Sequence, residues 1–108
     1  MKPSSNNLFH NIPQQLPSEL FETLVESETV TIERIVSCGH SSPESGWYDQ
    51  DRNEWVLVIQ GAAVLEFEEG PSLELKAGDH CNLPAHCKHK VAWTDPEQQT
   101  IWLAVFYS

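Results

Sequence analysis

A chain of 108 residues, 40% of them hydrophobic, is long enough for one globular domain with one core and too hydrophobic for a disordered protein. Its 16 acidic residues outnumber its 6 Lys and Arg residues, and the formal net charge of −10 repels nucleic-acid phosphates and anionic lipid surfaces. We therefore expect no nucleic-acid partner and no membrane association.

The first part of the chain predicts an irregular arm followed by a β-hairpin. Residues 1–17 contain three prolines and several amide side chains, which favours an N-terminal arm without regular structure, and the remaining residues 18–108 are expected to form one domain. Residues 18–27 fit either one face of a helix or a strand. We expect a single turn and then a strand, which would pair with residues 30–37 as a hairpin.

The rest of the chain carries a steady β pattern. Residues 54–60 form a continuous apolar run, typical of a strand that is buried on both faces or lies at an interface. Residues 62–79 alternate between apolar and charged side chains around a turn at residues 68–71. Further short strands are expected at residues 80–84, 89–94 and 100–107, and the alternation puts His89, Val91 and Trp93 on one face of the second of these. About eight short strands predict an all-β antiparallel sandwich or barrel.

Two spaced patterns resemble the motifs of the cupin superfamily. Glu54 is followed after six residues by Gly61, as at the end of the family's first motif, G-x5-H-x-H-x(3,4)-E-x6-G. Gly78, Pro84 and His89 are in register with the second motif, G-x5-P-x-G-x2-H-x3-N. The resemblance implies a jelly-roll β-barrel, also described as a cupin-like double-stranded β-helix, and it specifies the fold far more than the activity.

The chain departs from the family's pattern at the H-x-H pair. That pair would fall on Tyr48 and Gln50 with the shorter spacer, or on Trp47 and Asp49 with the longer one, and neither choice supplies a histidine. In the second motif, His86 stands where the family has its internal glycine. The first motif is therefore degenerate, which puts the usual metal site in question.

The resemblance implies a divalent metal ion (Fe, Mn, Zn or Ni) held by Glu54 and His89. Asp49 could replace one of the missing imidazoles with an oxygen ligand. Both main candidates also have an alternative explanation that needs no metal. Glu54 could be a buried acid paired with Arg34 or with a backbone amide, and His89 could be a core histidine.

Arg34 is a candidate ligand-binding residue on the expected hairpin. It shares one face with Val30, Ile32 and Val36 by period two, so a regular strand would point it into the barrel. There it could pair with Glu54 or clamp a substrate carboxylate or phosphate, whereas a bulge or bend would turn it outward. The other expected ligand-binding residues are Tyr48, Gln50, His86 and Trp93.

The three cysteines give little support to a covalent function. They are odd in number and form no C-x-x-C pair, which disfavours a disulfide framework or a zinc finger. Cys87 lies near His86 and His89, so a catalytic thiol is one interpretation, and a small half-buried hydrophobe is the more usual one. Because no apolar run suits a signal peptide or a transmembrane helix, we expect a cytoplasmic protein.

These observations predict a small cytoplasmic cupin that binds a divalent metal ion and a small organic ligand in its barrel. A metal-free binding or sensing cupin and a structural dimeric module are the alternatives, and catalysis is left open. Residues 54–60 and 100–107 carry more apolar surface than one barrel interior can hide, which predicts a homodimer. Its interface would include some of Trp55, Leu57, Ile59, Trp102 and Phe106.

Overall fold

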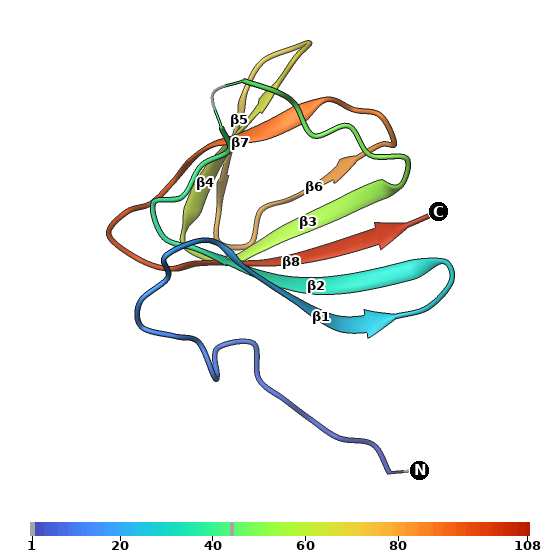
Figure 1. Ribbon diagram of the computed structural model, residues 1–108, viewed down its shortest axis with the longest axis vertical. Helices are drawn as coiled ribbons and strands as arrows, with labels where there is room; N and C mark the ends of the chain where they lie inside the picture. The colour runs from blue at the N-terminus through green and yellow to red at the C-terminus, as the bar shows by residue number, and fades with distance from the viewer. Residues whose placement is uncertain (1, 44) are drawn as a thin grey trace.

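The computed structural model describes residues 2–43 and 45–108, whose regular structure consists of β-strands alone (Figure 1). The eight strands within these residues are, in chain order, β1 (Leu20–Glu26), β2 (Val30–Ser37), β3 (Asn53–Gln60), β4 (Ala62–Phe67), β5 (Leu73–Lys76), β6 (His80–Leu83), β7 (His89–Thr94) and β8 (Thr100–Tyr107). Across the same described residues, no helix has the length and apolar character to cross a membrane. The predicted all-β class and the predicted number of strands are confirmed.

The strands form two antiparallel sheets that pack as two layers (Figure 1). The larger sheet has the order β1-β2-β8-β3-β6, and the smaller sheet has the order β5-β4-β7. The last strand, β8, pairs with both β2 and β3, so the end of the chain joins the hairpin β1–β2 to the middle of the sequence. Two layers with this strand order form the predicted jelly roll.

Period-two burial explains how the two layers share one core. On β3, Glu54, Val56 and Val58 are buried, and the residues between them are only half-buried. The buried hydrophobic residues that form the core cluster come from both sheets and are Val56, Val58, Ala63, Leu65, Leu75, Leu83, Trp102 and Ala104. The continuous apolar run of β3 therefore supplies two different faces, one to the core and one to the outside of the larger sheet.

A tight turn at Gly61 joins β3 in the larger sheet to β4 in the smaller one. Gly61 has a φ of 93°, in the left-handed region that favours glycine. A Cβ placed there would lie 2.7 Å from the Cα of Thr100, the first residue of β8. The glycine is thus required both by its backbone conformation and by the close approach of β8.

Arg34 points away from the space between the sheets. Its guanidinium donates hydrogen bonds to the backbone carbonyls of Leu8 and His10, at 3.0 and 2.7 Å, and pairs with the Glu22 carboxylate. The pairing of β2 with β8 runs without a bulge, so the four residues predicted to share a face do share it. The prediction that this face lies inside the barrel is wrong, because Arg34 instead binds the N-terminal arm to the outer face of the larger sheet.

The outer face of the larger sheet carries a row of partly exposed apolar side chains. On the two central strands they are Trp55, Leu57, Leu103 and Val105. Ile59 lies at a β-bulge where the pairing of β3 with β8 shifts register, so strand alternation does not place it on this face. Trp102 and Phe106 lie on the opposite face of β8, because they alternate with Leu103 and Val105. Of the residues predicted for a dimer interface, Trp55 and Leu57 therefore lie on a face that a partner could reach, and Trp102 and Phe106 do not.

Candidate functional site

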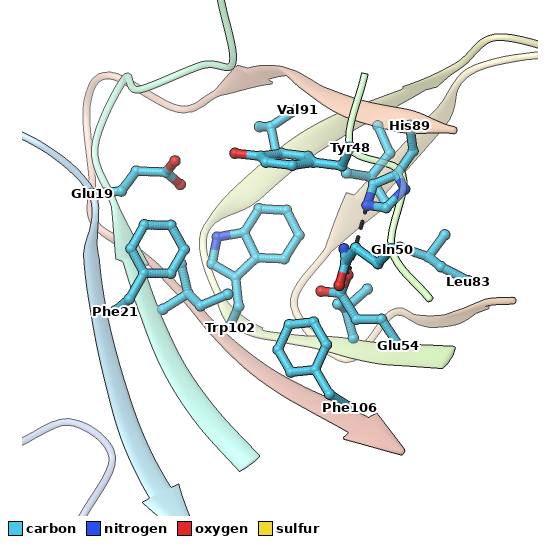
Figure 2. A pocket seen from close by; sticks show the side chains of 13 residues that line it. Glu19, Phe21, Tyr48, Gln50, Glu54, Leu83, His89, Val91, Trp102 and Phe106 are labelled. Atoms are coloured by element: carbon cyan, nitrogen blue, oxygen red, sulfur yellow. Dashed lines mark hydrogen bonds and ion pairs between the residues drawn. The ribbon is translucent and has the colours of Figure 1, made fainter. Parts of the chain in front are cut away.

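A cavity of about 250 Å³ opens between the two sheets at one end of the barrel (Figure 2). The residues that line it are Glu19, Phe21, Ile35, Tyr48, Gln50, Glu54, Val56, Leu65, Leu83, His89, Val91, Trp102 and Phe106. Both sheets contribute, and the loop before β3 supplies Tyr48 and Gln50. A mainly apolar cavity with a few convergent polar groups is the usual form of a small-molecule site.

The polar groups Gln50, Glu54 and His89 meet on one side of this cavity (Figure 2). The Gln50 side-chain amide donates a hydrogen bond of 3.0 Å to Glu54 Oε1, and His89 Nε2 lies 3.6 Å from the same oxygen. Glu54 and His89 are 8% and 5% exposed, so this is a buried histidine–carboxylate pair. Because a buried carboxylate is costly without a partner, Gln50 and His89 together make the burial of Glu54 tolerable.

Backbone pairing holds the loop before β3 over the cavity. Tyr48 and His89 exchange two backbone hydrogen bonds of 2.8 and 3.2 Å, which form an isolated β-bridge. The N–H of His86 donates to the Gln50 carbonyl at 2.7 Å. These bonds orient the side chains of Tyr48 and Gln50, and the Tyr48 ring lies 5.6 Å from the His89 ring, centre to centre.

His89 is held in a defined orientation by its other ring nitrogen. Nδ1 lies 2.8 Å from the Cys87 carbonyl, which can only accept, so Nδ1 carries a proton and donates it. Burial by itself would lower the pKa of His89, but the contacts with the Glu54 carboxylate and the Cys87 carbonyl raise this pKa above its ordinary value. In the charged form, both ring nitrogens face acceptors.

The raised pKa of His89 predicts a pH-dependent contribution to stability. Between the ordinary histidine pKa of about 6.5 and the raised value, the folded protein binds more protons than the unfolded chain. This contribution is therefore complete below about pH 6.5 and is lost as pH rises through the raised pKa. We expect the difference in melting temperature between wild type and His89→Gln to shrink from pH 6 to pH 8.5.

The matched control for this pH series is His86→Gln, which removes an exposed histidine. It should follow the wild-type pH dependence. If His89→Gln also follows the wild-type curve, the proposed His89 contribution is absent.

The negative charge of Glu54 contributes to raised pKa values of neighbouring groups. Burial and then the charge of Glu54 raise the pKa of Glu33, and the same two causes, in the same order, raise the pKa of the Cys81 thiol. Cys81 is therefore not an activated thiolate. Cys87 contributes to the site through its backbone carbonyl, which a change of side chain leaves in place.

Two predicted site residues pair with each other on the surface instead of joining the cavity. Asp49 Oδ1 lies 2.8 Å from Nδ1 of His86, and both side chains are well exposed. His86 has a φ of 64°, the left-handed conformation expected where the family's motif has a glycine. Asp49 and Gln50 are neighbours on an extended loop, so when Gln50 faces the cavity Asp49 faces outward.

Trp93 also lies outside the cavity, because β7 contains a β-bulge. His89 and Val91 line the cavity as the alternation predicts, but the pairing of β4 with β7 shifts register between Val64 and Leu65. The extra residue on β7 reverses the alternation, so Thr94 is buried and Trp93 is exposed. The prediction that Trp93 shares a face with His89 is wrong for this reason.

Other lining residues carry little signal in the sequence. Glu19 directly precedes β1 and Phe21 lies near its start, in the stretch whose helical and strand patterns compete. Val56 could have been identified from the sequence as a lining residue, since it lies two residues after Glu54 on the same strand face. Trp102 required knowledge of which face of β8 points inward.

The donor set suits a divalent metal ion poorly. Within the described residues, one imidazole and one carboxylate meet on this side of the cavity, and they already contact each other. The outward-facing Asp49 does not join them, and among residues 2–43 and 45–108 no group of three or more His, Cys, Asp or Glu side chains is arranged to hold a metal. Protein metal sites usually supply at least three such ligands.

Comparisons with known proteins agree with the observed architecture. The sequence profile described as "Cupin domain" matches residues 36–106. No curated protein matches the chain. A crystal structure of a candidate mannose-6-phosphate isomerase from Ralstonia eutropha JMP134 is 43% identical, with a TM-score of 0.94, over 98% of this chain and 99% of that one.

Two more distant structures share the fold. A cupin superfamily protein from Desulfitobacterium hafniense DCB-2 is 22% identical over 89% of this chain and 83% of that one, with a TM-score of 0.73. An RmlC-like cupin family protein with a double-stranded β-helix fold from Methanocaldococcus jannaschii is 20% identical over 89% and 85%, with a TM-score of 0.69.

Proposed function

Because this chain belongs to the cupin-domain family, we propose that it uses the barrel cavity to bind a small organic molecule, without requiring a metal ion. The observation that carries this proposal is the buried Glu54–His89 pair, which faces an otherwise mainly apolar cavity. Apolar walls supply most of the binding free energy of such sites, and a few polar groups orient the ligand. The cavity would hold about eight water molecules at roughly 30 Å³ each, so the ligand is small.

The sugar phosphate for which the Ralstonia eutropha relative is named is a poor match for this cavity. None of the lining residues is Lys or Arg, and two of them are glutamates. Arg34 is engaged by the N-terminal arm, and Arg52 donates to Thr31 Oγ1 and to the Phe106 carbonyl. A phosphate dianion would meet carboxylates and no cation, so we propose a ligand without a phosphate group.

The cavity proposal is tested by titrating ¹⁵N-labelled protein with toluene, a neutral probe of suitable size. Saturable shifts are expected for backbone amides around the cavity, because a preformed apolar cavity binds such molecules. In Val91→Phe, a larger side chain fills part of the cavity and should weaken these shifts. Asp49→Asn, which changes the exposed pair, should bind as wild type does. Absence of saturable shifts in the wild type would contradict the proposal.

Metal binding is the alternative that the cupin resemblance implies, and it is tested separately. We expect protein purified without a His tag, incubated with Mn(II), Fe(II), Zn(II) or Ni(II) and then desalted, to retain far less than one ion per chain. Two side-chain ligands that already contact each other should bind an ion weakly. One ion retained per chain, and lost in His89→Gln, would favour the metal-dependent function instead.

Proton-transfer catalysis is a second candidate function, and the Glu54–His89 pair favours it. The raised pKa of His89 places a proton next to a carboxylate in the cavity, which suits a general acid or base. The test is exchange of carbon-bound protons of dihydroxyacetone in D₂O, followed by NMR. Faster exchange with wild type than with Glu54→Gln would support catalysis, and equal rates with and without protein would exclude this candidate.

We further propose that two copies associate through the outer face of the larger sheet. The half-buried Trp55 and Leu57 lie on this face, and a two-fold interface is the usual symmetric way to cover such a surface. Light scattering at micromolar protein should give the mass of a dimer, and Leu57→Glu should give that of a monomer. A monomeric wild type would contradict the proposal.

A further inference from the structure

The end of the cavity remote from Glu54 contains a second polar group, the Glu19 carboxylate. Ser37, which is fully buried on β2, donates its hydroxyl to Glu19 Oε2 at 2.5 Å and so fixes the carboxylate. Glu19 Oε1 accepts no hydrogen bond from the residues that the structure describes. One carboxylate oxygen of Glu19 is therefore available to a donor in the cavity.

The indole N–H of Trp102 is a buried donor in the same cavity. Trp102 is 3% exposed, and within the described part of the chain its Nε1 has no hydrogen-bond partner. Figure 2 shows the indole nitrogen on the side of the ring that faces Glu19 and Phe21, away from Gln50 and Glu54. A buried N–H without a partner is costly, and such groups call for an explanation.

Taken together, we propose that Glu19 and the Trp102 N–H recognise a hydroxyl group, so that the cavity selects an uncharged molecule that carries one. A hydroxyl donates one hydrogen bond and accepts others, so it can donate to Glu19 and accept from Trp102 at once. This inference rests on the proposed ligand-binding function of the cavity. It adds the chemical class of the ligand and the residues that recognise its hydroxyl group.

Charged groups, and groups that only donate or only accept, match this pair of residues less well than a hydroxyl does. An ammonium group donates but does not accept, so the Trp102 N–H would stay unpaired beside it. A carbonyl or ether oxygen accepts but does not donate, and it would leave Glu19 unused. A phosphate or carboxylate would lie against Glu19 with no Lys or Arg among the lining residues.

The hydroxyl reaches the indole N–H by way of Phe21. The N–H is enclosed, but Phe21 is 55% exposed and belongs to β1, the edge strand of the larger sheet. We expect this exposed side chain to rotate toward solvent and open a path to the N–H. The indole N–H should therefore respond to a bound alcohol on the time scale of side-chain motion.

The test compares four probes that share one ring: toluene, benzyl alcohol, benzylammonium and benzyl phosphate. Each is titrated into ¹⁵N-labelled protein, and the indole N–H signals are followed, with that of Trp102 assigned from Trp102→Phe. Benzyl alcohol should shift this signal downfield, as a new hydrogen bond requires, and toluene should not. Benzyl alcohol should also bind more tightly than benzylammonium or benzyl phosphate.

Two variants separate this inference from the cavity proposal. Losing one neutral hydrogen bond changes affinity by about fivefold, so the affinity ratio of benzyl alcohol to toluene should fall by about that factor in Trp102→Phe. A hydrogen bond to a carboxylate is stronger, so the same ratio should fall by about tenfold or more in Glu19→Ala. If toluene binds but this ratio and the Trp102 signal do not respond, the hydroxyl site is overturned and the cavity proposal stands. If benzylammonium or benzyl phosphate binds best, the hydroxyl class is likewise overturned. If no probe binds the wild type, the cavity proposal itself fails.

Discussion

Replacing His89 with Leu is expected to lower the free energy of unfolding by about 3 kcal/mol, because Glu54 would stay buried without its partner. The amide of Gln50 would be its remaining side-chain partner among the described residues. Urea denaturation followed by tryptophan fluorescence measures the loss. The double variant Glu54→Leu/His89→Leu should recover much of it, since no unpaired charge is then left in the cavity.

The chain provides a matched control for this prediction. The surface pair of Asp49 and His86 has the same chemistry and a shorter separation, 2.8 Å instead of 3.6 Å, but both side chains are exposed. Asp49→Ala should therefore cost less than about 0.5 kcal/mol, as is usual for exposed pairs. A loss from His89→Leu that is no larger than the loss from Asp49→Ala would show that burial of Glu54 is not the controlling factor.

Gly61→Ala is expected to lower the free energy of unfolding by about 4 kcal/mol, at least as much as His89→Leu, because two costs add. A non-glycine residue at a φ of 93° is strained, and the new Cβ would lie 2.7 Å from the backbone of Thr100. The backbone of β8 cannot yield without disturbing the larger sheet. The measurement is the denaturation midpoint or, if the variant does not accumulate as folded protein, its solubility on expression.

Gly70→Ala separates the two costs of the Gly61 substitution. Gly70 has a similar φ of 99°, but a Cβ added there would meet no heavy atom within 4 Å. This variant should lose about 1–2 kcal/mol from backbone strain alone. Equal losses at both positions would mean that the close approach of β8 does not contribute.

The positions of the strands could be predicted from local sequence patterns. Which face of a strand points into the space between the sheets could not. Period-two alternation placed Arg34 on one face with its apolar neighbours, and that grouping was correct. Which face lies inside depends on the second sheet and on the arm, which supplies the carbonyls of Leu8 and His10 to Arg34. The second sheet and the arm are both distant from Arg34 in sequence. Because the outer face of the larger sheet is also apolar, the local pattern does not tell the inner face from the outer one.

A single bulge was enough to mislead the assignment of Trp93. The alternation of β7 held from His89 to Val91 and then reversed, because β7 has one residue more than its partner β4 at that point. Nothing in residues 89–94 marks the extra residue, since it is defined by the pairing of two strands. The same limit applies to Asp49, whose direction is set by the pairing of its loop with β7.

The sequence by itself determined the eight strands and the cupin motifs, because strand periodicity and motif spacing are local properties of the chain, and the family resemblance implied that Glu54 and His89 lie together. Only the tertiary structure decided what surrounds that pair. It brought Glu19 and Phe21 to the far end of the cavity, turned the indole of Trp102 toward them, and left Arg34, Asp49, His86 and Trp93 outside. These placements arise where strands from distant parts of the chain meet, and the packing of two sheets selects among faces that the local pattern leaves equivalent.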